Sequence, residues 1–225
     1  MGNHKQQRVG LFGGTFDPIH FGHLRAAEEI KQILELDKVY FIPTAISPHK
    51  ADTNVTPSSK RLEMLKLAIE GNKYFDISEF ELESESPSYT VLTLEHFNEM
   101  DPTSELYFIV GNEQFDQIET WRDYKRLFDL ANFAVITRPG FSELDSNRVP
   151  LALKDDFRYY NSIENVISYT NKSKEIVFIE IKGIEISSTD IRTFVKSKKS
   201  IKYLVPNKVQ NYILSEKLYD EEALK

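Results

Sequence analysis

Short apolar runs alternate with longer segments of helical periodicity along most of this chain. Apolar runs typical of buried strands lie at residues 9–12, 39–42, 75–78, 106–110, 133–137 and 176–181. Helical periodicity covers residues 23–36, 59–70, 90–100, 121–130, 188–196 and 207–218. In the first of these helices, Ala27, Ile30 and Leu34 form one apolar stripe. Strands that alternate with helices in this way predict βαβ units.

The alternation predicts an α/β fold, a Rossmann-like doubly wound parallel sheet with helices on both faces. We expect a single domain over residues 1–225, with a small C-terminal helical extension from about residue 187 to residue 225. The segment 141–170 has a mixed pattern and receives no assignment. Ligands of such sheets bind beyond the carboxyl ends of the strands. The residues that follow the strands are therefore the first candidates for function.

Composition narrows the class of protein. Hydrophobic residues make up 40% of the 225 residues and charged residues 28%, which suits a globular protein with a core. The net charge of -7 disfavours general nucleic-acid binding, which needs a basic surface. The absence of cysteine excludes disulfides, zinc-thiolate sites and a cysteine nucleophile.

Hydropathy and the first residues bear on location. No run approaches the roughly 20 apolar residues of a membrane span. The polar residues 1–7 contain no hydrophobic region of a signal peptide. We therefore expect a cytoplasmic protein with neither a membrane nor a nucleic-acid partner. The sequence leaves the oligomeric state open, a homo-oligomer included.

The loop after the first predicted strand carries most of the candidate chemistry. Gly13 and Gly14 permit close approach of the backbone to a ligand. The helix that follows offers free N–H groups and a positive dipole end, which suit a phosphate. His20 and His23 are three residues apart and can share one face of that helix start. The segment therefore predicts an anion site, although it is neither a Gly-x-Gly-x-x-Gly fingerprint nor a P-loop.

Two other interpretations of this loop remain open from the residues alone. An ordinary βα loop with two surface histidines has the same composition. The His-x-x-His spacing can also ligate zinc. A zinc site is the weaker of these because no convincing third ligand stands nearby.

A second candidate phosphate motif lies near the C-terminus. Ser187, Ser188 and Thr189 precede a predicted helix and are typical N-cap residues, whose hydroxyls also suit phosphate oxygens. Arg192 lies one turn inside that helix and can reach the same ligand with its planar fork. Taken alone, the motif is better explained as an ordinary capped amphipathic helix with a solvated arginine.

The loop at residues 13–23, with its His-x-Gly-His core, resembles the signature of the nucleotidyltransferase superfamily, which includes class I aminoacyl-tRNA synthetases. Together with the Ser-Ser-Thr-x-Ile-Arg run at residues 187–192, it resembles the paired phosphate elements of that superfamily. Markers between the two come in the order seen in bacterial nicotinate mononucleotide adenylyltransferases, a resemblance that runs from about residue 9 to residue 214. These markers are Pro48-His49-Lys50, Ser88-Tyr89-Thr90, Thr120-Trp121-Arg122 and Thr137-Arg138-Pro139-Gly140.

The resemblance implies adenylyl transfer from ATP to nicotinate mononucleotide, with Mg²⁺ on the ATP phosphates and no dedicated metal ligands from the chain. The implied catalytic residues are His20, His23 and Arg192. The implied ATP-binding residues are Gly13, Gly14, Thr15, Phe16, Gly111, Glu113, Ser187, Ser188 and Thr189. The implied mononucleotide-binding residues are Lys50, Thr90, Trp121, Arg122 and Arg138.

Physical chemistry agrees with the implied acceptor site. An aromatic face such as that of Trp121 suits a cationic pyridinium ring. Backbone N–H groups near Thr90 and Arg122 suit a carboxylate. The alternative for Trp121 is an ordinary core position.

One departure from the family pattern concerns the ribose of ATP. The family usually has Gly-x-Asp after the fourth strand, where this chain has Gly111-Asn112-Glu113. The extra methylene of Glu113 shifts its carboxylate and leaves its role open.

Two other functions of the protein also stay open. One is a sister enzyme with another acceptor, such as phosphopantetheine, an amide nucleotide or a cytidylyl-transfer substrate. The other is a non-catalytic nucleotide-binding module.

Overall fold

A computed structural model describes residues 6–45, 55–84, 86–137, 149–171 and 173–220. These residues contain an eight-stranded sheet with the order β3-β2-β1-β4-β5-β8-β7-β6. Its strands are β1 (Arg8–Gly14), β2 (Lys38–Pro43), β3 (Phe75–Ile77), β4 (Glu105–Gly111), β5 (Asn132–Thr137), β6 (Arg158–Ile163), β7 (Val166–Thr170) and β8 (Glu175–Glu180). The pairings from β3 through β8 in this order are parallel, whereas β7 pairs antiparallel with both β8 and β6. The predicted α/β fold with a mostly parallel sheet is confirmed.

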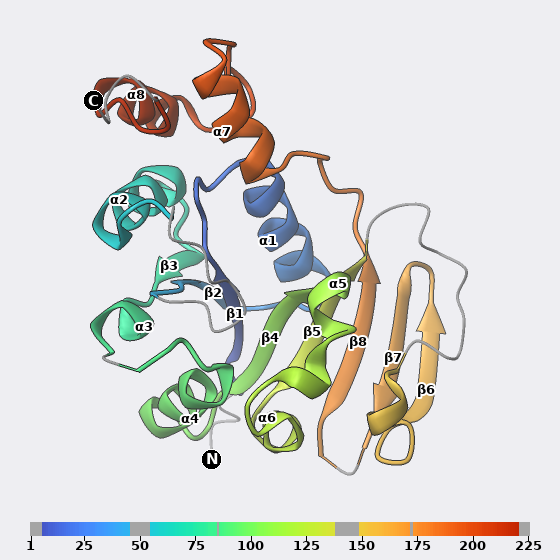
Figure 1. Cartoon of the computed structure of the whole chain (residues 1–225). Coiled ribbons are helices and arrows are strands. Elements are labelled where there is room, and N and C mark those ends of the chain that lie inside the picture. The colour runs from blue at the N-terminus through green and yellow to red at the C-terminus, as the bar shows by residue number, and fades with distance from the viewer. Residues whose placement is uncertain (1–5, 46–54, 85, 138–148, 172, 221–225) are drawn as a thin grey trace.

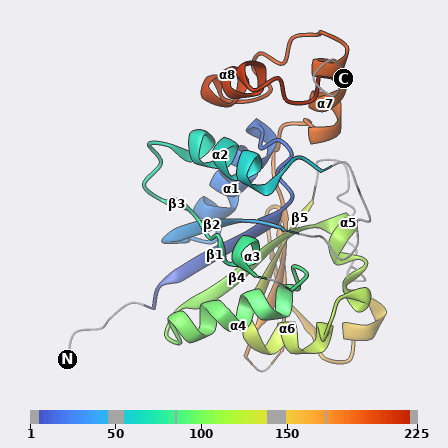
Figure 2. The ribbon, with the colours of Figure 1, turned by 60° about the vertical axis from the view of Figure 1, so that its left-hand side comes forward.

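Helices cover both faces of the sheet (Figures 1 and 2). They are α1 (Phe21–Ile33), α2 (Ser58–Ile69), α3 (Phe80–Glu83), α4 (Thr90–Met100), α5 (Asn112–Phe115), α6 (Tyr124–Leu130), α7 (Ser188–Lys196) and α8 (Asn207–Ser215). Side chains alternate between the faces along each strand. On β1, Phe12 joins the core with α1 and α2, while Leu11 joins the core with α4 and α6.

The helix predicted over residues 121–130 begins later than expected. Asp123 adopts a left-handed conformation with φ of 50°, so α6 starts only at Tyr124. Trp121 instead ends a 3-10 turn over Ile118–Thr120. Helical periodicity continues across the break, but a left-handed residue interrupts the hydrogen-bond ladder of a helix.

The unassigned segment 141–170 contains the antiparallel hairpin β6–β7 in its described part, which begins at residue 149. The sequence did not reveal β6 because every residue of this edge strand is exposed. An edge strand with no buried face lacks the apolar alternation on which strand prediction depends.

The C-terminal helices α7 and α8 lie at one end of the molecule, beside α1 and α2 (Figure 1). Ile191 of α7 and both Val209 and Ile213 of α8 belong to the same apolar core as α1. Apolar burial therefore attaches the last helices to the face of the sheet that α1 and α2 cover. Among the described residues, no helix combines the length and the apolarity that a membrane crossing requires.

Candidate active site

The order of the strands reverses at β1. The chain runs from β1 outward to β2 and β3, and then returns to place β4 on the other side of β1. In open α/β sheets this switch point forms a crevice at the carboxyl ends of the strands. Gly13 and Gly14 end β1 and Gly111 ends the neighbouring strand β4, so all three lie at the carboxyl ends of the strands beside the switch point. A Cβ on Gly14 would lie 2.9 Å from the ring of Phe16, which keeps this turn free of a side chain.

The two histidines stack at the start of α1. His20 is the N-cap residue, and its Nδ1 accepts the backbone N–H of His23 at 3.3 Å. The ring centroids of His20 and His23 lie 3.7 Å apart with an interplanar angle of 23°. Because Nδ1 of His20 accepts, the proton of its neutral imidazole sits on Nε2, which can donate to a ligand.

Glycine is required between these histidines. A Cβ on Gly22 would lie 2.9 Å from Nδ1 of His20 and 3.1 Å from the backbone oxygen of Ile184. The second of these neighbours cannot rotate away, because it is backbone. Gly22 therefore leaves room for the His20 imidazole to cap α1 and for the segment before α7 to approach α1.

Both imidazoles are neutral near pH 7. Burial lowers the pKa of His20 to about 4. Burial, together with the charge of a protonated His20, lowers the pKa of His23 well below its usual range. They can act as preoriented hydrogen-bond donors, but not as fixed cations.

The lowered pKa of His20 predicts acid sensitivity. An unfolded histidine takes up a proton near pH 6.5, whereas buried His20 resists protonation until about pH 4. The stabilisation is therefore present above pH 6.5 and is lost as the pH falls toward 4, on the order of 3 kcal/mol. His20→Asn keeps an N-cap acceptor and removes the imidazole. Thermal unfolding from pH 7 to pH 4 should show a steeper loss of Tm in the wild type than in His20→Asn; parallel curves would contradict the assignment.

The second motif caps its own helix. Ser187 Oγ accepts the backbone N–H of Asp190 at 3.0 Å and donates to the Asp190 carboxylate at 2.7 Å. This reciprocal cap uses the Ser187 hydroxyl, so the free N–H groups of the first turn of α7 are the better donors for an anion.

The second motif also bonds directly to the loop that precedes α1. Ser188 Oγ donates to the backbone oxygen of Pro18 at 2.9 Å. Arg192 donates from Nη1 to the backbone oxygen of Asp17 at 2.6 Å and from Nη2 to Thr189 Oγ1 at 3.3 Å. The structure thus brings together the N-termini of α1 and α7, which carry the two predicted phosphate motifs.

Arg61 of α2 is a site-supporting residue that the sequence analysis missed. Its side chain is almost completely buried, and it donates to the backbone oxygens of Thr15 at 2.7 Å, Thr44 at 2.8 Å and Thr56 at 2.9 Å. These carbonyls come from the ends of β1 and β2 and from the segment before α2, so one guanidinium fixes three chain segments. A signal was available, because Arg61 lies on the same helical stripe as buried Met64 and Leu65.

Two of the predicted mononucleotide-binding residues, Thr90 and Arg122, lie near the start of α4 on either side of Tyr89. Thr90 is the first residue of that helix. The guanidinium of Arg122 lies 4.7 Å from the ring centroid of Tyr89, which joins the Trp121-Arg122 and Ser88-Tyr89-Thr90 segments. Trp121 is half-buried, with its ring edge-on to Phe108 at a centroid distance of 6.0 Å.

Two other predicted mononucleotide-binding residues, Lys50 and Arg138, lie outside the described residues. Glu113 is exposed in the first turn of α5, directly after β4.

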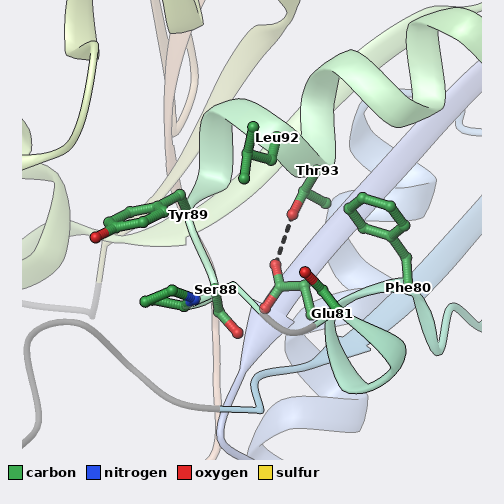
Figure 3. Close-up of a pocket in the computed structure, with 8 residues that line it drawn as sticks. Phe80, Glu81, Ser88, Tyr89, Leu92 and Thr93 are labelled. Carbon is green, nitrogen blue, oxygen red and sulfur yellow. Dashed lines mark hydrogen bonds between the residues drawn. The ribbon is translucent and has the colours of Figure 1, made fainter.

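A small pocket lies beside the segment Ser88-Tyr89, which precedes α4 (Figure 3). Its lining residues are Phe80, Glu81, Ser84, Pro87, Ser88, Tyr89, Leu92 and Thr93. Buried Glu81 accepts a hydrogen bond from Thr93 Oγ1 at 2.7 Å. Burial raises the pKa of Glu81, although hydrogen bonds from Thr93 and Ser88 oppose the rise. Ser88 Oγ in turn accepts a hydrogen bond from the backbone N–H of Ala45 at 3.0 Å. This bond connects the segment before α4 to the residues that follow β2.

Within the described ranges, no group of three His, Cys, Asp or Glu side chains is placed to hold a metal ion. The stacked pair of His20 and His23 therefore has no third partner there that would complete a zinc site.

Comparisons of the sequence and of the structure with known proteins all find nucleotidyltransferases. The cytidylyltransferase-like family matches residues 11–194. A protein of Desulfitobacterium hafniense (strain Y51) named "Probable nicotinate-nucleotide adenylyltransferase" is 40% identical over 217 residues, covering 96% of this chain and 98% of its own length. A protein of Moorella thermoacetica with the same name is 41% identical over 215 residues, covering 94% and 91%. The nicotinic acid mononucleotide adenylyltransferase of Plasmodium falciparum, solved in complex with NaAD, shares the fold with a TM-score of 0.71 at 21% identity, covering 95% of this chain and 98% of that one.

Proposed function

The chain belongs to the cytidylyltransferase-like family, among the nicotinate-nucleotide adenylyltransferases, and we propose that it joins ATP to nicotinate mononucleotide in NAD biosynthesis. The products are nicotinate adenine dinucleotide and pyrophosphate. The single observation that carries the site assignment is the direct bonding of the two phosphate motifs, through Ser188 to Pro18 and Arg192 to Asp17. An ATP bound there would contact both helix N-termini.

The reaction needs no general base from the protein. A phosphate monoester has a second pKa of about 6, so the attacking phosphate of the mononucleotide is already largely dianionic at pH 7. Its oxygen attacks the α-phosphorus of ATP, and the bond to the pyrophosphate oxygen breaks. The protein must align these groups and stabilise the charge that develops on the phosphates.

The residues at the crevice supply donors for that purpose. Neutral His20 and His23 can donate without the desolvation cost of a buried cation, and both lie at the positive end of α1. The first turn of α7 provides further N–H groups, and Arg192 adds a positive charge. We assign His20, His23 and Arg192 to the reacting phosphates.

We propose that Mg²⁺ accompanies ATP and is held mainly by its phosphates and by water. The buried carboxylate closest in sequence to the histidines, that of Asp17, already accepts hydrogen bonds at both oxygens from the chain. When bound, the ion would neutralise charge on the phosphates of ATP.

The acceptor pocket should prefer nicotinate over nicotinamide mononucleotide by about 10- to 100-fold in kcat/KM. Backbone N–H groups near Thr90 and Arg122 can pair with both oxygens of a carboxylate. The amide would place its NH₂ group against one of them, and an unpaired buried donor costs roughly 1–3 kcal/mol. The test measures pyrophosphate release from ATP and Mg²⁺ with each mononucleotide.

Other acceptors define the outcomes of the same assay. Pyrophosphate release with phosphopantetheine or a cytidylyl-transfer substrate, and none with the pyridine nucleotides, would assign the chain to a sister activity. Equal rates with nicotinate and nicotinamide mononucleotide would agree with adenylyl transfer but contradict the assignment of a carboxylate-binding pocket. No release with any acceptor would contradict the enzyme assignment.

A further inference from the structure

Residues beyond the second motif also contact the first motif, at the start of α1. The backbone oxygen of Leu204 accepts the N–H of Phe21, the first residue of α1, at 3.0 Å. The hydroxyl of Tyr219 donates to Asp17 Oδ1 at 2.7 Å, across 202 positions of sequence. Together with Ser188 and Arg192, these residues attach the chain from residue 188 to residue 219 to the segment 17–21, which ends with the first residue of α1.

Asp17 is the centre of this attachment. It is 5% exposed, and its second carboxylate oxygen accepts the backbone N–H of Thr56 at 3.2 Å. A buried carboxylate must have its oxygens paired, because leaving one without a donor costs more than the bond itself contributes. The positive charge of Arg61 interacts with the same carboxylate. Tyr219 therefore completes a buried network rather than adding a surface contact.

The hydroxyl of Tyr219 stays protonated at working pH. Burial raises its pKa, and the negative charge of Asp17 raises it further. It can therefore act only as the donor toward Asp17. Phenylalanine at this position would keep the ring and remove that donor.

Resting on the function proposed above, we propose that Tyr219 is a positioning residue for adenylyl transfer, which fixes the loop of His20 and His23 through the carboxylate of Asp17. Asp17 lies three residues before His20, and its backbone oxygen also receives Arg192. A shift of this loop would move the histidines and the arginine together. Small displacements of reacting groups have large kinetic effects.

The test compares Tyr219→Phe with Tyr203→Phe. Both tyrosines lie in the C-terminal segment with nearly the same left-handed backbone, at φ of 66° and 67°, but Tyr203 is 74% exposed. We expect Tyr219→Phe to lower kcat about tenfold and to weaken the Kd for ATP about fivefold, with KM for nicotinate mononucleotide within about twofold of wild type. Tyr203→Phe should match the wild type in all three. Identical kinetics for the two variants would overturn the proposal.

A double-mutant cycle with Asp17→Asn tests the route of the effect. If Tyr219 acts through Asp17, adding Tyr219→Phe to Asp17→Asn should lower kcat by less than about twofold further. Fully multiplied effects would overturn the proposed route. The Kd for ATP is measured without an acceptor, so it reports on the loop even if the wild-type enzyme proves inactive with nicotinate mononucleotide, which is the result that would defeat the proposed function instead.

Discussion

His23→Ala is expected to lower kcat about 10²- to 10³-fold while changing the Kd for ATP by less than about threefold. His23 lies in the first turn of α1, its ring stacked on that of His20. Its neutral imidazole is preoriented there, and removing one preorganised donor to transition-state charge typically costs about 10²–10³ in rate. The backbone N–H groups at the starts of α1 and α7 would still be available to bind ATP in the variant, so the ground state should lose far less stabilisation than the transition state.

His23→Phe is the matched control for packing. The phenyl ring can keep the stacking on His20 and the edge-on contact with Phe16, but it has no N–H group. We expect it to be as slow as the alanine variant, as measured by pyrophosphate release at saturating substrates. A kcat near that of wild type in His23→Phe would show that the ring packs the loop and does not contribute a donor.

Arg192→Lys is expected to lower kcat/KM for ATP about 100-fold although the charge is kept. The guanidinium already donates at two points, to the backbone oxygen of Asp17 and to Thr189 Oγ1, and it has further N–H groups for a ligand. A lysine ammonium cannot span these partners and a phosphate in one geometry. Hydrogen bonds to charged groups contribute about 1.5–3 kcal/mol each, so losing one or two accounts for an effect of this size.

Arg126→Lys provides the control substitution, since Arg126 forms an exposed ion pair with Glu95 on the other face of the sheet. Exposed pairs of this kind contribute about 0–1 kcal/mol, so this variant should retain full activity. The comparison is made by steady-state kinetics over a range of ATP concentrations. Full activity in Arg192→Lys would reduce the role of Arg192 to its electric field.

Local pattern was sufficient for the elements that bury a regular face. The strand at 106–110 and the helix at 90–100 have strong periodicity, and β4 and α4 lie where they were expected. The edge strand β6 has no buried face, and the left-handed Asp123 leaves no periodic trace, so both escaped prediction. Such features depend on the surroundings of a residue rather than on its neighbours in sequence.

The sequence by itself determined the chemistry: two glycines and two histidines after the first strand, a Ser-Ser-Thr and an arginine at a later helix start, and the family to which they point. Only the tertiary structure decided how these groups meet. Their contacts join residues 170 or more positions apart. The side chains that hold them, Arg61, Asp17 and Tyr219, act through hydrogen bonds with distant backbone and side-chain atoms. A buried polar group must find its partner wherever the fold provides one, and no local pattern records that choice.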